Sequence, residues 1–556
     1  MEDKVGIVYG ESSTDYFTFI VDPKNMPNFG EFVVVKNRNG EEVLAVVKSV
    51  KNINWLMSAG RGSYDYIEKT VTIFSKGVLD KSESIIASAK VLGVLKTKED
   101  IESGDFEFRQ IPNRVPIKPG EVVKLADNDD LKKIFSNGHI RIGRLLARAD
   151  VEVGLDVDRL VSRHFAVLAV TGAGKSNTIA VLTKEIIDKT RGTIVILDPH
   201  GEYSSLTWKN ARVNPIKATI DPSKITISEF ATLLGIAENA SLQRRFLSLA
   251  YHTVKWEAKN QAKVLGGLSF VEALEDQIEE WIRTYENKSK GEEAFIDYYD
   301  SQGRVLQRKI QARDLDSLIR IKDYLQELKA NFGEFIKLGN VLSEIVPGMA
   351  NIIDLSGMEE DQMIALASYL LRGVLKYRVQ YMKALRTNDA ATLKMIREKF
   401  PALTKPLLLV IEEAHIFAPR GEKTQASHWL GKIAREGRKF GIGLGIVSQR
   451  PKKLDDDILS QTNTKIILRL VEPHDQKYVQ QASEQISEDL LMDIASLGIG
   501  EAVIVGYAIS LPAMVKIYSF KDEFKGYYGG GDIDIVKEWS EGEEREDFDL
   551  ADFAGE

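Results

Sequence analysis

Hydrophobic and polar residues follow two different patterns along the chain, and the change falls near residue 140. In the first part, apolar runs at 31–35 and 43–47 are rich in valine and are separated by the dipeptide Asn39-Gly40. An Asn-Gly pair between two such runs is a strong hairpin signal. The pattern therefore predicts a small β-barrel at the amino end.

A second pattern begins at Phe165, where the apolar run 165–170 leads into a glycine-rich turn and then a helical run from Lys175 to Lys189. A strand, a turn and a helix in this order start a parallel α/β sheet. Further buried strands are expected at 193–197, 351–355, 407–411, 443–447, 465–470 and 502–505. Together these segments predict one wound α/β sheet.

Between residues 216 and 346 helical spacing replaces the strand pattern, and apolar residues recur on one face at Leu315, Leu318, Ile321, Leu325 and Leu328. This predicts a helical insertion, with its most polar stretch, 287–304, as an exposed loop. The expected domains are the β-barrel (1–140), the first part of the α/β core (141–215), the insertion (216–346), the second part of the core (347–510) and a C-terminal segment with an acidic tail (511–556).

The composition is that of a folded protein with several domains: 556 residues, 44% hydrophobic, 28% charged and without cysteine. The missing thiols exclude disulfides and thiolate metal sites. Neither a signal peptide nor an apolar run of membrane-spanning length is evident in the sequence. We therefore expect a cytoplasmic protein with no membrane partner.

The acidic charge of the chain is concentrated in its last twenty residues. Residues 537–556 hold nine acids and two bases, so this tail carries −7 of the net charge of −8. A protein that encloses DNA needs positive charge only along its channel, so a nearly neutral body is compatible with that partner. Trp539, Phe548 and Phe553 interrupt the acids, which favours a docking or subunit-bracing arm as much as a disordered tail.

The strongest motif is Thr171-Gly172-Ala173-Gly174-Lys175-Ser176, which follows an apolar run and opens a helix. Glycines let backbone amides surround an anion at the positive end of a helix. We expect an ATP-binding P-loop in which Lys175 holds the β- and γ-phosphates and Ser176 contacts Mg²⁺. The wound α/β sheet is then expected to be the RecA-like core of a P-loop ATPase. Ala169 stands where the common pattern has its first glycine. The expected nucleotide-binding residues are Gly172, Ala173, Gly174, Lys175, Ser176 and Asn177.

A second motif is the apolar run 407–411, which ends in Glu412 and Glu413 as a Walker B strand does. Successive strand residues point to opposite faces, so the two acids should differ in role. We expect Glu412 to support the hydrated Mg²⁺ and Glu413 to act as the catalytic base that activates water.

Polar residues follow the next predicted strand, 443–447, where Ser448 and Gln449 come directly after it. Gln449 is interpreted as a sensor of the γ-phosphate. The basic cluster at 432–439 lies between these strands and offers two arginines that could reach a neighbouring subunit. We favour Arg438 over Arg435 as an arginine finger in trans.

The turn 198–203, with the sequence Asp-Pro-His-Gly-Glu-Tyr, follows a core strand and opens at the ligand-binding edge of the sheet. Two interpretations are open for it, a role near Mg²⁺ or DNA and a capped structural turn.

Taken in order, five segments resemble the HerA family of archaeal and bacterial DNA translocases, which are FtsK-type P-loop ATPases. They are Arg163-His164, 171–177, 198–203, 412–415 and 448–451, and the likeness extends to the barrel and its junction at 140–143. The resemblance supports Lys175, Ser176, Glu412, Glu413 and Gln449 at the ATP site and places Arg163 near it.

The resemblance implies an ATP hydrolase coupled to translocation or unwinding of double-stranded DNA. It further implies a homo-hexamer with DNA in its central channel and a NurA-type nuclease as partner in DNA end resection for recombinational repair. Three alternatives remain: a protein-translocating ATPase of the type IV secretion kind, an ATP-locked scaffold for a nuclease, and a small-molecule kinase, which the long insertion and the paired acids fit poorly.

Overall fold

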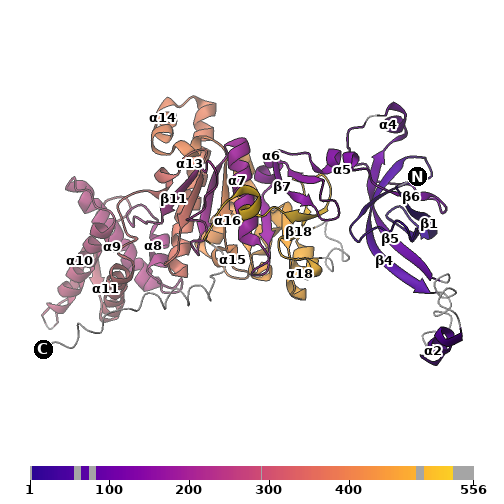
Figure 1. The fold of residues 1–556 in the computed structure, drawn as a ribbon. Coiled ribbons are helices and arrows are strands. Elements are labelled where there is room, and N and C mark those ends of the chain that lie inside the picture. Colours follow the sequence, from indigo (N-terminus) through magenta and orange to yellow (C-terminus); the bar gives the residue numbers. More distant parts are fainter. Residues whose placement is uncertain are drawn as a thin grey trace, which may run out of the picture.

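The computed structural model describes residues 3–54, 64–73, 83–104, 106–289, 291–483 and 494–529. These residues form an elongated molecule with a barrel at one end, an α/β sheet in the middle and a group of helices at the other end (Figure 1). The acidic tail at 537–556 lies outside the described residues, so the two interpretations of it stay predictions.

The amino-terminal strands form a closed barrel in the order β1-β2-β5-β4-β3-β6, which confirms the predicted barrel. Alternate residues such as Phe17 and Phe19 point inward and are fully buried, as expected for strands with one face on a core. Its strands are β1 (Lys4–Ser12), β2 (Tyr16–Val21), β3 (Phe32–Lys36), β4 (Glu42–Asn54), β5 (Glu83–Lys96) and β6 (Val122–Leu125). The accompanying helices are α2 (Tyr64–Ile73), α4 (Lys98–Ser103) and α5 (Asn128–Phe135).

The middle region is one sheet of eleven strands in the order β11-β14-β10-β15-β16-β9-β17-β18-β19-β7-β8. Strands β11 to β17 in this order run parallel, and the remaining pairs from β17 to β8 are antiparallel. The bounds are β7 (Ile140–Leu145), β8 (Glu152–Leu155), β9 (Phe165–Leu168), β10 (Thr193–Asp198), β11 (Val213–Lys217), β14 (Ala350–Asp354), β15 (Leu407–Ile411), β16 (Ile442–Ser448), β17 (Thr464–Leu468), β18 (Glu501–Val505) and β19 (Ala513–Ile517). The wound sheet and each strand predicted within it are confirmed.

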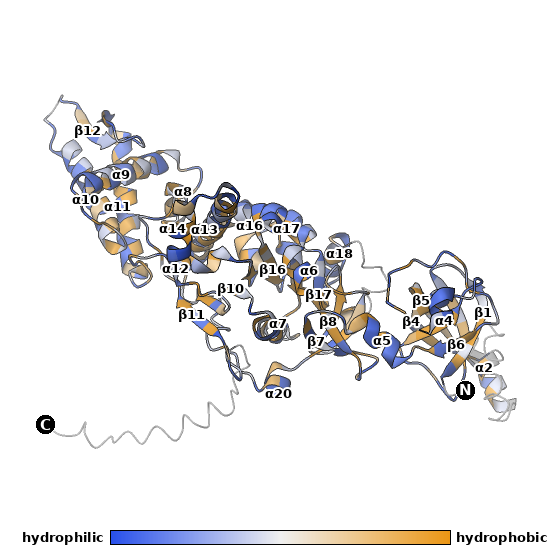
Figure 2. Cartoon of the chain, turned by 90° about the horizontal axis from the view of Figure 1, so that it is seen from above, coloured by the Kyte–Doolittle hydropathy of each residue, from blue (hydrophilic) through white to orange (hydrophobic). Residues whose placement is uncertain are grey.

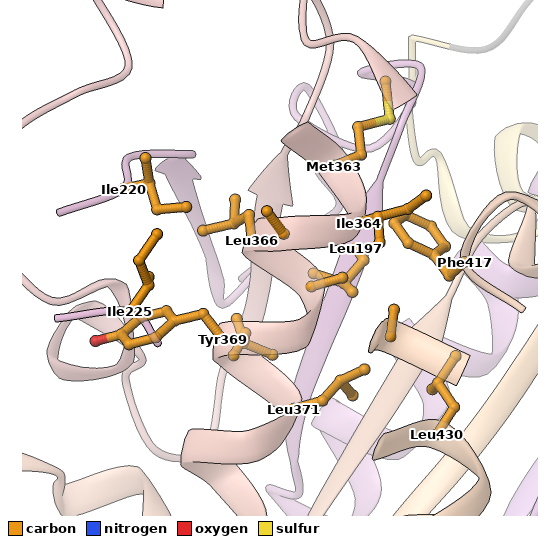
Figure 3. Packing of buried hydrophobic residues seen from close by; sticks show 14 of the residues in the cluster. Leu197, Ile220, Ile225, Met363, Ile364, Leu366, Tyr369, Leu371, Phe417 and Leu430 are labelled. Carbon is orange, nitrogen blue, oxygen red and sulfur yellow. The ribbon is translucent and has the colours of Figure 1, made fainter. Parts of the chain in front are cut away.

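Two hydrophobic clusters cover the two faces of this sheet, because successive strand residues alternate between them. On β10, Val195 and Leu197 belong to one cluster, whereas Ile194 and Ile196 belong to the other. Figure 3 shows Leu197 packed against residues of the long helix α13 on the first face. Helix α7 supplies apolar side chains to the second cluster.

Helices surround the sheet with apolar faces inward, and Figure 2 shows the hydrophilic outer faces of α16 and α17. The helices of this region are α6 (Val157–Ser162), α7 (Lys175–Thr190), α13 (Glu360–Thr387), α14 (Ala390–Lys399), α15 (Ala414–Phe417), α16 (Gln425–Glu436), α17 (Asp456–Gln461), α18 (Pro473–Gln481) and α20 (Phe520–Phe524), with 3₁₀ turns at η1 (Pro401–Thr404), η2 (Gly437–Phe440) and η3 (Pro451–Lys453). In the described part of the chain, none of the helices has the length and apolar character needed to cross a membrane.

The segment between β11 and β14 is helical, as the spacing predicts, with Leu318, Ile321, Leu325 and Leu328 buried along one helix. The prediction of an exposed loop at 287–304 is wrong for residues 294–299, which form strand β12 and pair with β13 in an antiparallel hairpin. Inward residues of the hairpin, such as Ile296, join the hydrophobic core. The elements are α8 (Ile227–Leu233), α9 (Ser241–Asn260), α10 (Leu268–Glu286), β12 (Ala294–Tyr299), β13 (Val305–Ile310), α11 (Ala312–Phe332) and α12 (Val341–Glu344).

Candidate active site

The glycine-rich turn joins the end of β9 to the start of α7 and leaves an open cradle. Gly172 has a φ of +75°, and a Cβ built there would meet no described atom within 4 Å. Gly174, at φ +104°, is the N-cap of α7 and has no side chain with which to cap the helix. Amides at such a helix start bind anions, and phosphate in particular. The residues present therefore fit a polyphosphate.

Not every residue of the motif lines this cradle. Ala173 is buried, and its carbonyl oxygen accepts a hydrogen bond from the Gly500 amide at 3.0 Å. Asn177 uses its side chain to hold a distant segment, since it donates to the Tyr518 carbonyl oxygen and accepts from the Phe520 amide, both at 2.8 Å. Ala169 is buried in the core with its amide bonded to Ser448, so the strand tolerates alanine where the common motif has glycine.

Lys175 lies between the two glutamates that follow β15. Its Nζ is 3.1 Å from an Oε atom of Glu412 and also pairs with Glu413, and the lysine is 5% exposed. Burial alone would lower the pKa of Lys175, but the charges of Glu412 and Glu413 outweigh burial and raise it. The lysine is therefore held as a cation at the end of the strand.

The two glutamates have opposite electrostatic environments. Burial raises the pKa of Glu412 despite the nearby Lys175. Burial also acts on Glu413, but hydrogen bonds from His415 and Lys175 lower the pKa of that carboxyl below its ordinary value. One oxygen of Glu412 is buried without a hydrogen-bond partner among the described residues. Such an orphaned carboxylate oxygen fits a ligand of Mg²⁺ or of its water shell.

Gln449, just after β16, connects the P-loop to Glu413. Its amide nitrogen donates to Glu413 at 2.7 Å, and its amide oxygen accepts a hydrogen bond from the Thr171 hydroxyl. His415 pairs with Glu413 at 3.3 Å and contacts the Ser448 hydroxyl at 3.3 Å. The strand ends β9, β15 and β16 therefore bring Lys175, Glu412, Glu413 and Gln449 together.

The turn after β10 is both capped and close to the P-loop. Asp198 accepts hydrogen bonds from the amides of Glu202 (3.1 Å) and Tyr203 (2.7 Å), which shape the turn. The Ser176 hydroxyl donates to the Glu202 carboxylate at 2.5 Å. Tyr203 is fully buried and donates from its hydroxyl to Glu412 at 3.3 Å. The turn places a third carboxylate beside the serine expected to contact Mg²⁺.

The three arginines singled out from the sequence do not lie beside the P-loop of their own chain. Arg438 lies in η2 and lines a separate cavity of about 510 Å³ beside the first residues of β10 and β15. Arg435 is near the end of α16, next to Gly431. Arg163 precedes β9 and lies over the Tyr507 ring at 5.6 Å.

The expectation that Arg163 is near its own ATP site is therefore corrected. Strand β9 runs from the edge of the sheet that holds Arg163 to the edge that holds the P-loop, so the two are on opposite edges. The same holds for Arg438, since Glu412 and Glu413 follow β15 whereas Arg438 lies where that strand begins. Neither arginine therefore lies at the ATP site of its own chain.

A cavity of about 590 Å³ adjoins the P-loop, and the part of its wall that residues between 499 and 528 form is not assigned to a site by the sequence. The Gly500 amide is bonded to Ala173, and Asn177 is bonded to residues 518 and 520, so these segments close over the P-loop. No local sequence pattern marks them as part of a site. The lining residues outside the P-loop and Gln449 are Val170, Glu202, Ile499, Gly500, Lys516, Ile517, Ser519 and Tyr528.

Three family models match the chain: the HAS barrel domain at 5–97, the central domain of helicase HerA at 140–374 and the helicase HerA-like C-terminal region at 398–519. The DNA double-strand break repair helicase HerA of Pyrococcus furiosus is 44% identical over 97% of both chains. The probable DNA double-strand break repair helicase HerA of Methanocaldococcus jannaschii is 42% identical over 96% of this chain and 98% of the relative.

Among solved structures, VirB4 of Thermoanaerobacter pseudethanolicus covers 69% of this chain and 97% of its own, at 14% identity and a TM-score of 0.45. A similarity this low adds nothing to the assignment.

Proposed function

The chain belongs to the HerA helicase family, and from that premise we propose that it is an ATP-driven helicase of double-stranded DNA in the repair of double-strand breaks. The observation that carries the proposal is the cluster of Lys175, Glu412, Glu413 and Gln449 around an open P-loop. A cation, two carboxylates and an amide at the ends of neighbouring parallel strands are the groups that hydrolysis of a nucleoside triphosphate needs.

The phosphates of ATP would lie on the amides of Gly172 to Ser176 with Lys175 against the terminal phosphate. Ser176, Glu412 and Glu202 are the oxygen donors that would hold Mg²⁺ or its waters. Bound Mg²⁺ neutralises charge on the phosphate oxygens during transfer to water.

Glu413 is the residue we assign as base for the attacking water. Its ion pairs with Lys175 and His415 hold its pKa low, and phosphate oxygens compete with Glu413 for Lys175. A Glu413 released from Lys175 is a stronger base. Gln449 is hydrogen-bonded to both Glu413 and Thr171. A change in the P-loop when nucleotide binds would therefore reach Glu413 through Gln449.

We further propose a ring of six subunits with DNA in its channel and a NurA-type nuclease as partner, as the family resemblance implies. The position of Arg438 supports a ring, because this arginine lies at the sheet edge opposite its own P-loop. In a ring, that edge of one subunit can face the ATP site of the next, where Arg438 would stabilise charge on the transferred phosphoryl group.

The test is to measure ATP hydrolysis with and without linear duplex DNA, together with the mass of the particle. The proposal predicts a six-subunit mass and hydrolysis that rises with DNA. A protein-translocating ATPase or an ATP-locked scaffold predicts no response to DNA, and that result would contradict the proposal.

A further inference from the structure

The last described residues form a short segment beside the nucleotide cavity, which we define as the strap, residues 525–529. Helix α20 ends at Phe524, its C-cap Lys525 has a left-handed backbone, and the chain then turns back. Tyr527 pairs with Thr207 through two backbone hydrogen bonds of 2.9 Å, and the Gly529 amide donates to the Glu202 carbonyl oxygen at 2.8 Å. The strap is therefore attached to the same turn that places Glu202 beside Ser176.

Neighbouring tyrosines of the strap have different environments. The Tyr527 side chain is 61% exposed, so only its backbone takes part in the attachment. Tyr528 lines the cavity and packs on the Phe520 ring, with 6.0 Å between ring centroids. Burial, followed by the charge of Glu202, raises the pKa of Tyr528, so its hydroxyl stays protonated. The cavity therefore has one aromatic wall, supplied by the strap.

The cavity is lined by two groups of residues of different character. Lys175, Ser176 and the P-loop amides make the first, whereas Ile499, Ile517 and Tyr528 bring apolar surface to the cavity. Asn177, in the first turn of α7, is bonded to residues 518 and 520 and so ties this wall to the P-loop. A triphosphate held on the P-loop leaves the nucleoside to occupy the part of the cavity outside it.

We propose that Tyr528 contacts the nucleoside of bound ATP, by stacking of its ring on the base, and that the strap is thereby part of the ATP site. This inference rests on the proposed function, since it requires ATP in the cavity. An aromatic ring stacked on a base contributes about 1 to 3 kcal/mol when measured by alanine substitution, and each 1.4 kcal/mol is tenfold in affinity. Loss of the ring should therefore weaken ATP binding by about fivefold to 150-fold.

The test is calorimetric titration of the full chain with Mg²⁺ and either ATPγS or inorganic tripolyphosphate. Tyr528→Ala should lose about tenfold affinity for ATPγS and keep its affinity for tripolyphosphate, which has no nucleoside. Tyr528→Phe keeps the ring and should bind as the wild type does. Tyr527→Ala is the matched control on the same strap and should also bind normally.

Unchanged ATPγS affinity in Tyr528→Ala, or an equal loss for tripolyphosphate, would overturn the inference and leave the proposed function standing. Failure of the wild type to bind either ligand would overturn both. Photolabelling of the wild type with 8-azido-ATP removes any dependence on how the variant folds. The label should map to residues 525–529, and a label found only elsewhere overturns the inference.

Discussion

His164 provides a quantitative prediction, because it joins the P-loop strand to the helix that precedes Arg438. Its Nδ1 accepts a hydrogen bond from the Leu444 amide at 3.0 Å, and its Nε2 is 3.0 Å from the Ala434 carbonyl oxygen. A neutral ring with its proton on Nε2 satisfies both contacts, whereas a second proton on Nδ1 would oppose the Leu444 N–H. Burial lowers the pKa of His164 from 6.5 to about 4, although the bond to Ala434 opposes this.

The stability that depends on His164 should disappear in acid. The unfolded chain, with the higher pKa, binds the proton more readily, so the stabilisation is complete above pH 6.5 and decreases as the pH falls towards 4. The difference between the two pKa values corresponds to a contribution of about 3 kcal/mol to the free energy of unfolding. About 2 kcal/mol of this contribution is lost at pH 5.

The assay is denaturant unfolding of the α/β core at pH 7.5 and pH 5.0. His164→Gln loses two buried hydrogen bonds and should be less stable than the wild type at pH 7.5. Its free energy of unfolding should then fall by about 2 kcal/mol less than that of the wild type when the pH is lowered to 5.0. His200→Gln, at an exposed position, is the control and should keep the wild-type pH dependence. Equal pH dependence in His164→Gln and the wild type would refute the reasoning.

Other predictions concern the ATP site and the ring. Lys175→Ala should lose nucleotide binding, and Glu413→Gln should bind nucleotide without hydrolysing it; wild-type turnover by Glu413→Gln would refute the assignment of the base. Arg438→Ala should lower the rate of ATP hydrolysis about 10³-fold or more. Mixing Arg438→Ala with Glu413→Gln subunits, under conditions where rings exchange subunits, should restore hydrolysis. Hydrolysis that stays at background in confirmed mixed rings would point to Arg435 instead. DNA binding should weaken with salt by about −0.9 in log–log slope for each phosphate contact, and a slope near zero would exclude a charged channel.

Features that depend on neighbouring residues in sequence could be predicted. The apolar run, the glycines and the helix from Lys175 are local signals, and parallel strand ends meet at one edge of a sheet, so the sequence alone assigns Glu412, Glu413 and Gln449 to one site. The β12–β13 hairpin is not predicted because the apolar and aromatic residues of β12 (Ala294–Tyr299) form only a short run between polar stretches. Only alternate residues of that run, such as Ile296, are fully buried.

Features that depend on long-range contacts could not be predicted. Gly500 and Tyr528 reach the cavity because the antiparallel strands β18 and β19 return the chain over the P-loop, more than three hundred residues after it. Arg163 is close to the P-loop in sequence, and this closeness alone suggests a place at the ATP site. The strand β9 lies between them, however, and puts Arg163 and the P-loop at opposite ends of that strand.

The most direct test of the central claim is strand displacement from linear duplex DNA by the wild type and by Glu413→Gln at equal protein concentration. The account predicts displacement that requires ATP and Mg²⁺ in the wild type, and none in Glu413→Gln although that variant still binds ATP and DNA. Equal displacement by the two proteins, or displacement without ATP, would contradict an ATP-driven DNA helicase with its chemistry at Glu413.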